Sequence, residues 1–222
     1  MARFITSPLE RDRGIASRVV ENESGAACTT GYFVPPPHYF YPTIWVWVKI
    51  TTAKMNNGNE YWLAVLSDTH GHERLTKAAL AVLKPYRPKA YFHAGDIGSE
   101  TIIRMFPNDC PCYFVHGNCD RYPEHMAKAA EDAGHQWHGE LATLSLNGRK
   151  IALVHGDQPR TLANAIESQQ FDLVIHGHTH QTRVEQKGKT LIFNPGAVYR
   201  ANPRSVALLD LDALRHEYLY FR

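Results

Sequence analysis

The chain has 222 residues, of which 44% are hydrophobic and 21% are charged, and its formal net charge at pH 7 is +2. This length and composition are typical of a soluble globular protein with one sizeable core, and they exclude a disordered chain. No run approaches the roughly 18 apolar residues of a membrane-spanning helix, and the mixing of acidic and basic residues argues against a broad surface for nucleic acid.

Residues 1–59 differ from everything that follows them. They contain Pro35-Pro36-Pro37 and a turn-rich segment over 22–31, and they show little regular apolar periodicity. One strand is expected over 43–50. We predict an N-terminal extension of uncertain order over 1–59, outside the domain that follows over 60–222.

From residue 61 the pattern alternates between buried strands, polar loops and amphipathic helices. Strands are predicted over 61–67, 89–93 and 112–116, and helices over 72–83, 99–106 and 123–133. Alternating units of this kind indicate a mostly parallel sheet with helices packed against it.

The second half of the chain is richer in strands. The turn Asn147-Gly148 between apolar runs over 141–146 and 150–155 is a strong hairpin signal. A helix is predicted over 160–169, and strands over 172–176, 181–186, 190–194, 206–211 and 217–221. The whole pattern predicts an α/β fold in which two stacked mixed β-sheets are flanked by helices.

Five short polar segments each follow a predicted strand and combine Asp, Asn or His with glycine. They are Ser67-Asp68-Thr69-His70-Gly71, Gly95-Asp96-Ile97-Gly98, Gly117-Asn118-Cys119-Asp120, His155-Gly156-Asp157 and Gly177-His178-Thr179-His180. Ligand sites gather at the carboxyl ends of the strands in α/β sheets. Taken singly, each segment has an ordinary alternative, such as a capped turn or a surface histidine. The occurrence of all five segments together is explained better by one shared site than by coincidence.

The residue types in these segments point to metal binding. Carboxylate oxygens, an amide oxygen and imidazole nitrogens suit Mn²⁺, Fe or Zn²⁺. The four cysteines form no Cys-x-x-Cys pair, which argues against a structural zinc site and favours reduced thiols in a cytoplasmic protein. Two ions about 3.5–4 Å apart need a bridging carboxylate, and their charge turns a bound water into hydroxide near neutral pH. Asp96 is the expected bridge.

In this order the five segments resemble the pattern of the calcineurin-like metallophosphoesterase superfamily, which is D-x-H, GD, GN-x-[DE], a lone H and GH-x-H. The resemblance covers residues 61–221, and the GNCD form is similar to the compact YfcE-type phosphodiesterase branch. It implies a β-sandwich flanked by helices and an enzyme that hydrolyses phosphate esters. The implied cofactors are two divalent ions, with Mn²⁺ favoured and Fe, Zn²⁺ or Ni²⁺ as alternatives.

The resemblance also implies roles for individual residues. One ion would be held by Asp68, His70 and His180, and the other by Asn118, His155 and His178, with Asp96 between them. A hydroxide that bridges the ions would attack phosphorus in line with the leaving group. Asn118 and His178 would contact the phosphate, and His178 would stabilise its developing charge.

The third segment departs from many larger members of the family, which carry His where this chain has Cys119. That His is thought to protonate the leaving group, and a thiol is a poor substitute for it near pH 7. Either another group protonates the leaving oxygen or good leaving groups are preferred. Cys119 and Asp120 stay candidates for catalysis, although support of a metal ligand is the favoured role of Asp120.

Two further segments have competing interpretations. Asn194-Pro195-Gly196 follows a predicted strand, so Asn194 and Gly196 either contact the phosphate or belong to a plain turn. His135 and His138 lie away from every motif, and surface or hairpin packing is expected for both.

The main alternative function is a non-catalytic scaffold of the same fold, which the complete set of competent ligands disfavours. A nuclease on the same metal core is another, but the chain has no basic stripe with interleaved aromatic residues. We therefore expect a small phosphodiester or phosphomonoester substrate, and long nucleic acid is the less favoured alternative that stays open. The choice between diester and monoester stays open, and so does homo-oligomer formation.

Overall fold

The computed structural model describes residues 16–18, 31–33 and 61–222. The chain divides into two compact units, Met1–Met55 with Arg222 and Asn56–Phe221. Within the first unit, strand β1 (Ala16–Arg18) pairs antiparallel with β2 (Gly31–Phe33). The strand expected over 43–50 lies outside the described residues, and the extension over 1–59 stays a prediction.

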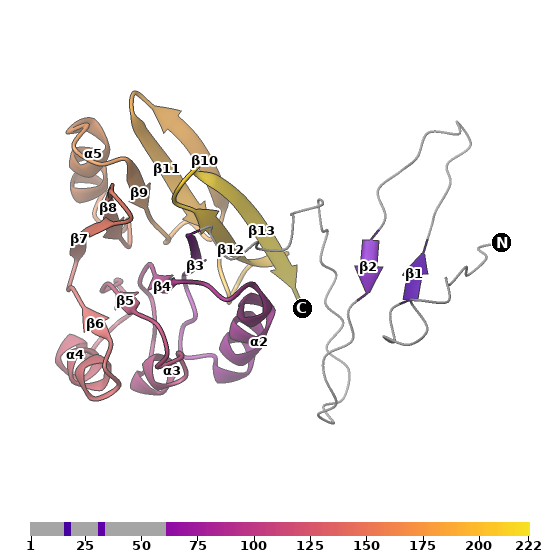
Figure 1. Ribbon diagram of the computed structural model, residues 1–222. Coiled ribbons are helices and arrows are strands. Elements are labelled where there is room, and N and C mark those ends of the chain that lie inside the picture. The colour runs from indigo at the N-terminus through magenta and orange to yellow at the C-terminus, as the bar shows by residue number, and fades with distance from the viewer. Residues whose placement is uncertain (1–15, 19–30, 34–60) are drawn as a thin grey trace, which may run out of the picture. The chain divides into compact units, whose positions relative to one another are not determined.

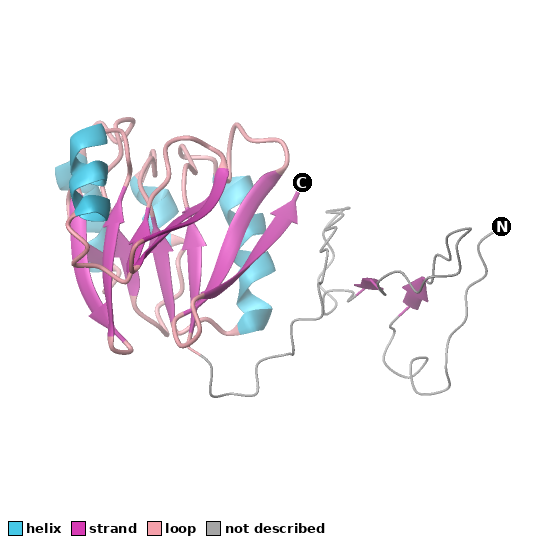
Figure 2. Cartoon of the chain, turned by 90° about the horizontal axis from the view of Figure 1, so that it is seen from above, coloured by secondary structure: helices cyan, strands magenta, loops and turns pink. Residues whose placement is uncertain are grey.

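Two β-sheets form the framework of the second unit, as Figure 1 and Figure 2 show. The first sheet has the strand order β13-β12-β3-β4-β5-β6, and the second has the order β10-β11-β9-β8-β7. The first consists of β3 (Trp62–Leu66), β4 (Ala90–His93), β5 (Cys112–Phe114), β6 (Gln136–Trp137), β12 (Arg204–Asp210) and β13 (Arg215–Phe221). The second consists of β7 (Leu141–Leu146), β8 (Arg149–Val154), β9 (Leu173–Ile175), β10 (Thr182–Lys187) and β11 (Thr190–Pro195).

Both sheets are mixed. Strands β3 to β6 run parallel to one another, and so do β8, β9 and β11, whereas the remaining pairings are antiparallel. The predicted α/β fold of two mixed sheets is therefore confirmed.

The helices flank the sheets. Figure 1 shows α2 (Glu73–Leu83), α3 (Glu100–Arg104) and α4 (Pro123–Asp132) beside the first sheet, and α5 (Pro159–Glu167) beside the second. Helix α2 buries one apolar face, on which Leu75, Ala79 and Leu83 follow one another at intervals of four residues. It continues into the 3₁₀ turn η1 (Lys84–Tyr86), where Pro85 limits its extension.

The main core combines side chains from both sheets. Leu63 and Phe92 come from the first sheet, Ile151 and Phe193 come from the second, and all four are fully buried. Each such side chain stabilises the fold by about 1.5–3 kcal/mol relative to an exposed one. Because helices cover the sheets on their other faces, the central strands are continuous apolar runs rather than alternating ones.

The predicted strands and helices over 61–222 are confirmed to within two residues at their ends. Strand β6 was not expected, and the prediction of surface or hairpin packing for His135 is wrong. That residue is 7% exposed, and its ring lies 5.8 Å from the ring of Phe114. The next two residues form β6, parallel to β5. A strand of two residues is too short to show an apolar period.

The carboxyl ends of β3, β4, β5, β8 and β9 position the five polar segments. Backbone hydrogen bonds join neighbouring loops, since Asp68 N donates to Gly95 O at 3.1 Å and His70 N donates to Asp96 O at 2.9 Å. A further bond joins the two sheets, from His155 Nδ1 to Ala94 O at 2.8 Å. The segments therefore meet at one edge of the sandwich. Among the described helices, none combines the length and the apolar character needed to cross a membrane.

Candidate metal centre

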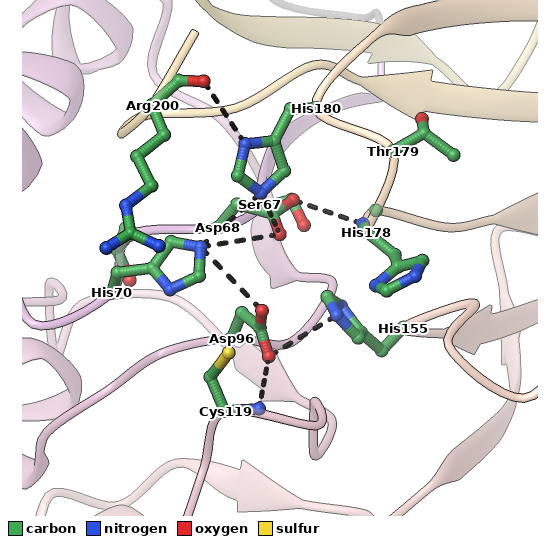
Figure 3. A network of polar contacts seen from close by, with 12 residues as sticks. Ser67, Asp68, His70, Asp96, Cys119, His155, His178, Thr179, His180 and Arg200 are labelled. Atoms are coloured by element: carbon green, nitrogen blue, oxygen red, sulfur yellow. Dashed lines mark hydrogen bonds and ion pairs between the residues drawn. The ribbon is translucent and has the colours of Figure 1, made fainter.

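One group of three potential ligands consists of Asp68, His70 and His180, whose ligand atoms all lie within 4.8 Å of one another. Asp68 Oδ1 lies 3.1 Å from His180 Nε2 and 3.9 Å from His70 Nε2, and the two imidazole nitrogens are 3.4 Å apart. Figure 3 shows both rings directed at the Asp68 carboxylate. This arrangement leaves space between one carboxylate oxygen and two nitrogens for a common partner.

Asp96 lies beside this group and faces a second one. Its Oδ2 is 3.7 Å from His70 Nε2, and its Oδ1 is 3.3 Å from His155 Nε2. His155 Nε2 in turn lies 3.2 Å from Asn118 Oδ1, and the ring of His178 is edge-on to the His155 ring at 5.1 Å. The seven predicted ligands thus form one cluster with Asp96 in the middle and the His178 ring at the periphery.

Backbone carbonyl groups orient two of the imidazoles. Nδ1 of His155 donates to Ala94 O at 2.8 Å, and Nδ1 of His180 donates to Arg200 O at 3.3 Å. Because Nδ1 is the donor, Nε2 of each imidazole faces the centre, and the neutral form of each ring would present its lone pair there, as a metal ligand must.

The charges of the centre fit a bound cation. Asp68 Oδ1 is buried and has no hydrogen-bond partner among the described residues. Burial raises the pKa of the Asp68 carboxyl above its ordinary value. A buried carboxylate oxygen without a hydrogen-bond donor is costly, and a cation between Oδ1 and the two imidazoles would remove that cost. The donor set of this chain therefore fits a divalent ion.

Asp96 and His155 form a charged pair at the middle of the centre. Burial opposes ionisation of Asp96, but the hydrogen bond and charge of His155 lower the pKa of Asp96 well below its usual range. Burial also opposes protonation of His155, but the hydrogen bond and charge of Asp96 raise the pKa of His155 to about 8. Asp96 is therefore a carboxylate at neutral pH.

The backbone is strained at most of the predicted ligands. Five of the seven have positive φ angles, which are 57° for Asp68, 46° for His70, 55° for Asp96, 67° for His178 and 57° for His180. The left-handed region costs a residue other than glycine roughly 1–3 kcal/mol, and such residues cluster at functional sites. The surrounding hydrogen bonds must offset this strain. Such strain does not stabilise the fold, so it points to a functional role of these loops.

The two other predicted catalytic residues occupy different environments. Asp120 is 3% exposed, and its two oxygens accept hydrogen bonds from Gly98 N at 2.7 Å and Gly117 N at 2.9 Å. It joins two loops of the centre, as expected of a supporting residue. Cys119 is exposed, and its backbone N donates to Asp96 Oδ1 at 2.8 Å. Burial and the neighbouring Asp96 raise the pKa of the Cys119 thiol to about 11.

Asn194 and Gly196 are not brought into the ligand cluster. Asn194 is fully buried, and its amide donates to Gly177 O at 2.8 Å and lies 3.2 Å from Thr179 Oγ1. Its Oδ1 accepts from Gly196 N at 2.9 Å. The geometry favours support of the loop that carries His178 over a direct contact of Asn194 with phosphate.

A cavity of about 640 Å³ opens beside His70. Its walls include His72, Cys119, Tyr199 and Arg200. We did not predict His72, Tyr199 and Arg200 as site residues. For the last two, the one sequence signal was their position a few residues after Asn194-Pro195-Gly196, for which a contact with the phosphate was one of two interpretations.

The chain is similar to known phosphoesterases. The model of the calcineurin-like phosphoesterase superfamily domain matches residues 62–214. Phosphodiesterase MJ0936 of Methanocaldococcus jannaschii is 25% identical over 154 residues, which are 68% of this chain and 93% of that protein. Phosphodiesterase YfcE of Escherichia coli is 33% identical over 159 residues, which are 69% of this chain and 74% of that protein.

A solved structure shares the fold. It is that of an archaeal phosphodiesterase, with a TM-score of 0.67 and 23% identity, and the match covers 72% of this chain and 99% of that one. The domain match and the two relatives support a hydrolase that acts on phosphate esters with the help of metal ions. The chain belongs to the calcineurin-like phosphoesterase superfamily, in its YfcE-type branch.

Proposed function

We propose that this enzyme is a phosphodiesterase with two divalent ions that share Asp96. The observation that carries the proposal is the orientation of Asp96, whose oxygens face His70 at 3.7 Å and His155 at 3.3 Å. A carboxylate with a different imidazole beside each oxygen is arranged to bridge two cations. One ion would be held by Asp68, His70 and His180, and the other by Asn118, His155 and His178.

Mn²⁺ is the proposed ion, with Fe, Zn²⁺ and Ni²⁺ as alternatives, because the donors mix carboxylate, amide oxygen and imidazole. When bound, the ions would make a water molecule more acidic for attack on phosphorus and would neutralise charge on the phosphate. The exposed side chains of Asn118 and His178 would donate hydrogen bonds to the phosphate oxygens as their charge grows. His155 and His180 would keep their orientation through their carbonyl partners.

The substrate is proposed to be a small phosphodiester. The cavity of about 640 Å³ beside His70 has the size of an ordinary small-ligand site. The relatives named phosphodiesterases favour a diester over a monoester. Free thiols at Cys110, Cys112 and Cys119 support the cytoplasmic location expected from the sequence.

A non-catalytic scaffold is the weaker alternative. It predicts lost or mismatched donors, whereas each predicted ligand position of this chain carries a competent group and the groups converge on Asp96. Nothing in the centre favours the scaffold over the enzyme.

Metal removal and restoration test the proposed function. Chelated protein is expected to lose hydrolysis of bis-p-nitrophenyl phosphate, and added Mn²⁺ is expected to restore it by about 1,000-fold, because the ions supply several kcal/mol of transition-state stabilisation. The rate with p-nitrophenyl phosphate, measured in parallel, gives the preference for diester over monoester. Protein that binds Mn²⁺, Ni²⁺, Zn²⁺ or Fe²⁺ and hydrolyses neither ester would contradict the proposal.

A further inference from the structure

The loop after β11 crosses the end of β3 and ends beside the candidate metal centre. Val198 N donates to Ser67 O at 3.1 Å, and Tyr199 N donates to Asp68 O at 3.0 Å. These two hydrogen bonds fix the loop against the strand that carries the first ligands. The next residue, Arg200, is thereby held next to the ligand loops of both sheets.

The backbone of Arg200 is strained and tied to a ligand. Its φ angle is 54°, in the left-handed region. Its carbonyl oxygen accepts the hydrogen bond of His180 Nδ1 at 3.3 Å. The strain at this position therefore accompanies a contact that orients an imidazole of the centre.

The side chain of Arg200 turns toward the cavity. It lines the cavity together with His70 and Cys119, and Figure 3 shows its guanidinium beside the His70 ring. The guanidinium carbon lies 5.4 Å from the centroid of the Tyr199 ring. Among the described residues, no carboxylate forms an ion pair with Arg200. An exposed guanidinium beside the candidate metal ligands therefore has N–H groups available to donate hydrogen bonds to an anion.

Because Cys119 stands where many relatives of the family have a histidine, the charge on the leaving oxygen has to be stabilised by another group, and a cation can do so. When the bond between phosphorus and the leaving oxygen breaks, both electrons stay on that oxygen. A thiol is a weaker acid than an imidazolium near neutral pH, so Cys119 is poorly suited to protonate it. A fixed positive charge with several N–H donors stabilises the oxyanion without a proton transfer.

We propose that Arg200 binds the leaving-group oxygen of the substrate and stabilises its negative charge as the P–O bond breaks. The attacking water supplies the oxygen of the new P–O bond and loses its proton to solvent. The guanidinium keeps its protons, and solvent water protonates the released alcohol afterwards. The inference rests on the proposed function and adds a substrate class, namely esters of acidic hydroxyl groups such as phenols or enols.

Two diesters that differ in their leaving groups test the proposal. Bis-p-nitrophenyl phosphate releases a weakly basic phenolate, whereas diphenyl phosphate releases a far more basic one. In Mn²⁺-loaded Arg200→Ala we expect kcat to fall about 100-fold with diphenyl phosphate, the size of loss seen for a single oxyanion donor, and far less with the nitrophenyl ester. Arg200→Lys keeps the charge but not the planar fork, and it is expected to restore part of the loss with diphenyl phosphate.

Arg74→Ala is the matched control, since Arg74 is another exposed cation of the same cavity. If both arginines only attract anions, then Arg200→Ala and Arg74→Ala should each raise KM, and by similar factors for the two esters. Metal content and thermal melting, measured on each variant, show whether the carbonyl contact to His180 survives. An equal loss of kcat with both esters, or a loss of metal from Arg200→Ala, overturns the role of Arg200 while the wild-type enzyme stays active. Inactive metal-loaded wild-type protein overturns the proposed function as well.

Discussion

Asp96→Asn is expected to abolish metal-dependent hydrolysis, with kcat lower by about 1,000-fold or more, because the charge that two ions would share in the proposed centre is worth several kcal/mol. Asparagine has the same shape and keeps an oxygen for the hydrogen bond from Cys119 N, which is 2.8 Å from Asp96 Oδ1. It carries no negative charge. Metal content should therefore fall at both positions, and atomic emission measurements on the purified variant check this.

The fold should survive this substitution. Without the carboxylate, His155 loses the partner that keeps its pKa high and becomes neutral, so no unpaired charge stays buried. We expect the melting temperature of the metal-free variant to stay within a few degrees of the metal-free wild type. Asp157→Asn is the matched control, since Asp157 lies two residues after His155 but in none of the ligand groups. Near-normal turnover and metal content in Asp96→Asn would show that the two ions do not share this residue.

Exposed His178 offers a second test of the same centre. Its ring lies 5.1 Å from that of His155, and the side chain is not part of the core. His178→Ala is therefore expected to remove most activity without unfolding the protein, and hydrolysis of bis-p-nitrophenyl phosphate together with thermal melting measures both effects. Unchanged activity would exclude His178 from the centre.

Gly98→Ala is expected to destabilise the fold by about 3 kcal/mol or more, because added atoms in a tightly packed place force the backbone to move. Gly98 has a φ angle of 85°, and a Cβ atom on it would lie 2.5 Å from the backbone carbon of His70 and closer still to Gly71 N. Backbone atoms cannot change rotamer to make room. The loop that carries Asp68 and His70 would have to separate from the loop that carries Asp96, so metal affinity should also be lost.

Gly139→Ala separates the steric effect from backbone strain. Gly139 also has a positive φ angle, 63°, but no atom lies within 4 Å of a Cβ placed there. This control should cost only about 1 kcal/mol for the left-handed backbone. Urea unfolding of both variants gives the two free energies. Similar losses for Gly98→Ala and Gly139→Ala would mean that the two ligand loops are not held in close contact at Gly98.

The clustering of the candidate ligands was predictable because sequence and topology point to the same place. Asp68 and Asp96 each follow a buried parallel strand, and such strands end at one edge of a sheet. His155 and His178 follow two parallel strands of the other sheet, β8 and β9. The period of the apolar runs fixes where these strands end, and the motif supplies the ligand types.

Arg200 could not be predicted in the same way. Its place depends on hydrogen bonds from Val198 and Tyr199 to the carbonyl groups of Ser67 and Asp68, more than 100 positions away in the chain. No local pattern encodes such a pairing of loops. The burial of Asn194 could not be predicted for a similar reason, since its hydrogen-bond partners Gly177 and Thr179 belong to a different loop.

The distance in sequence between the candidate ligands has a consequence for the order of folding and metal binding. His178 N donates to Asp68 Oδ2 across 110 positions of the chain, and His70 and His180 are equally far apart. While the ribosome makes the protein from its N-terminus, Asp68, His70 and Asp96 emerge long before His178 and His180 exist. An ion that meets the nascent chain would find only part of the proposed ligand set, and we expect it not to be retained. We therefore expect metal loading to be completed only after the second sheet has closed against the first.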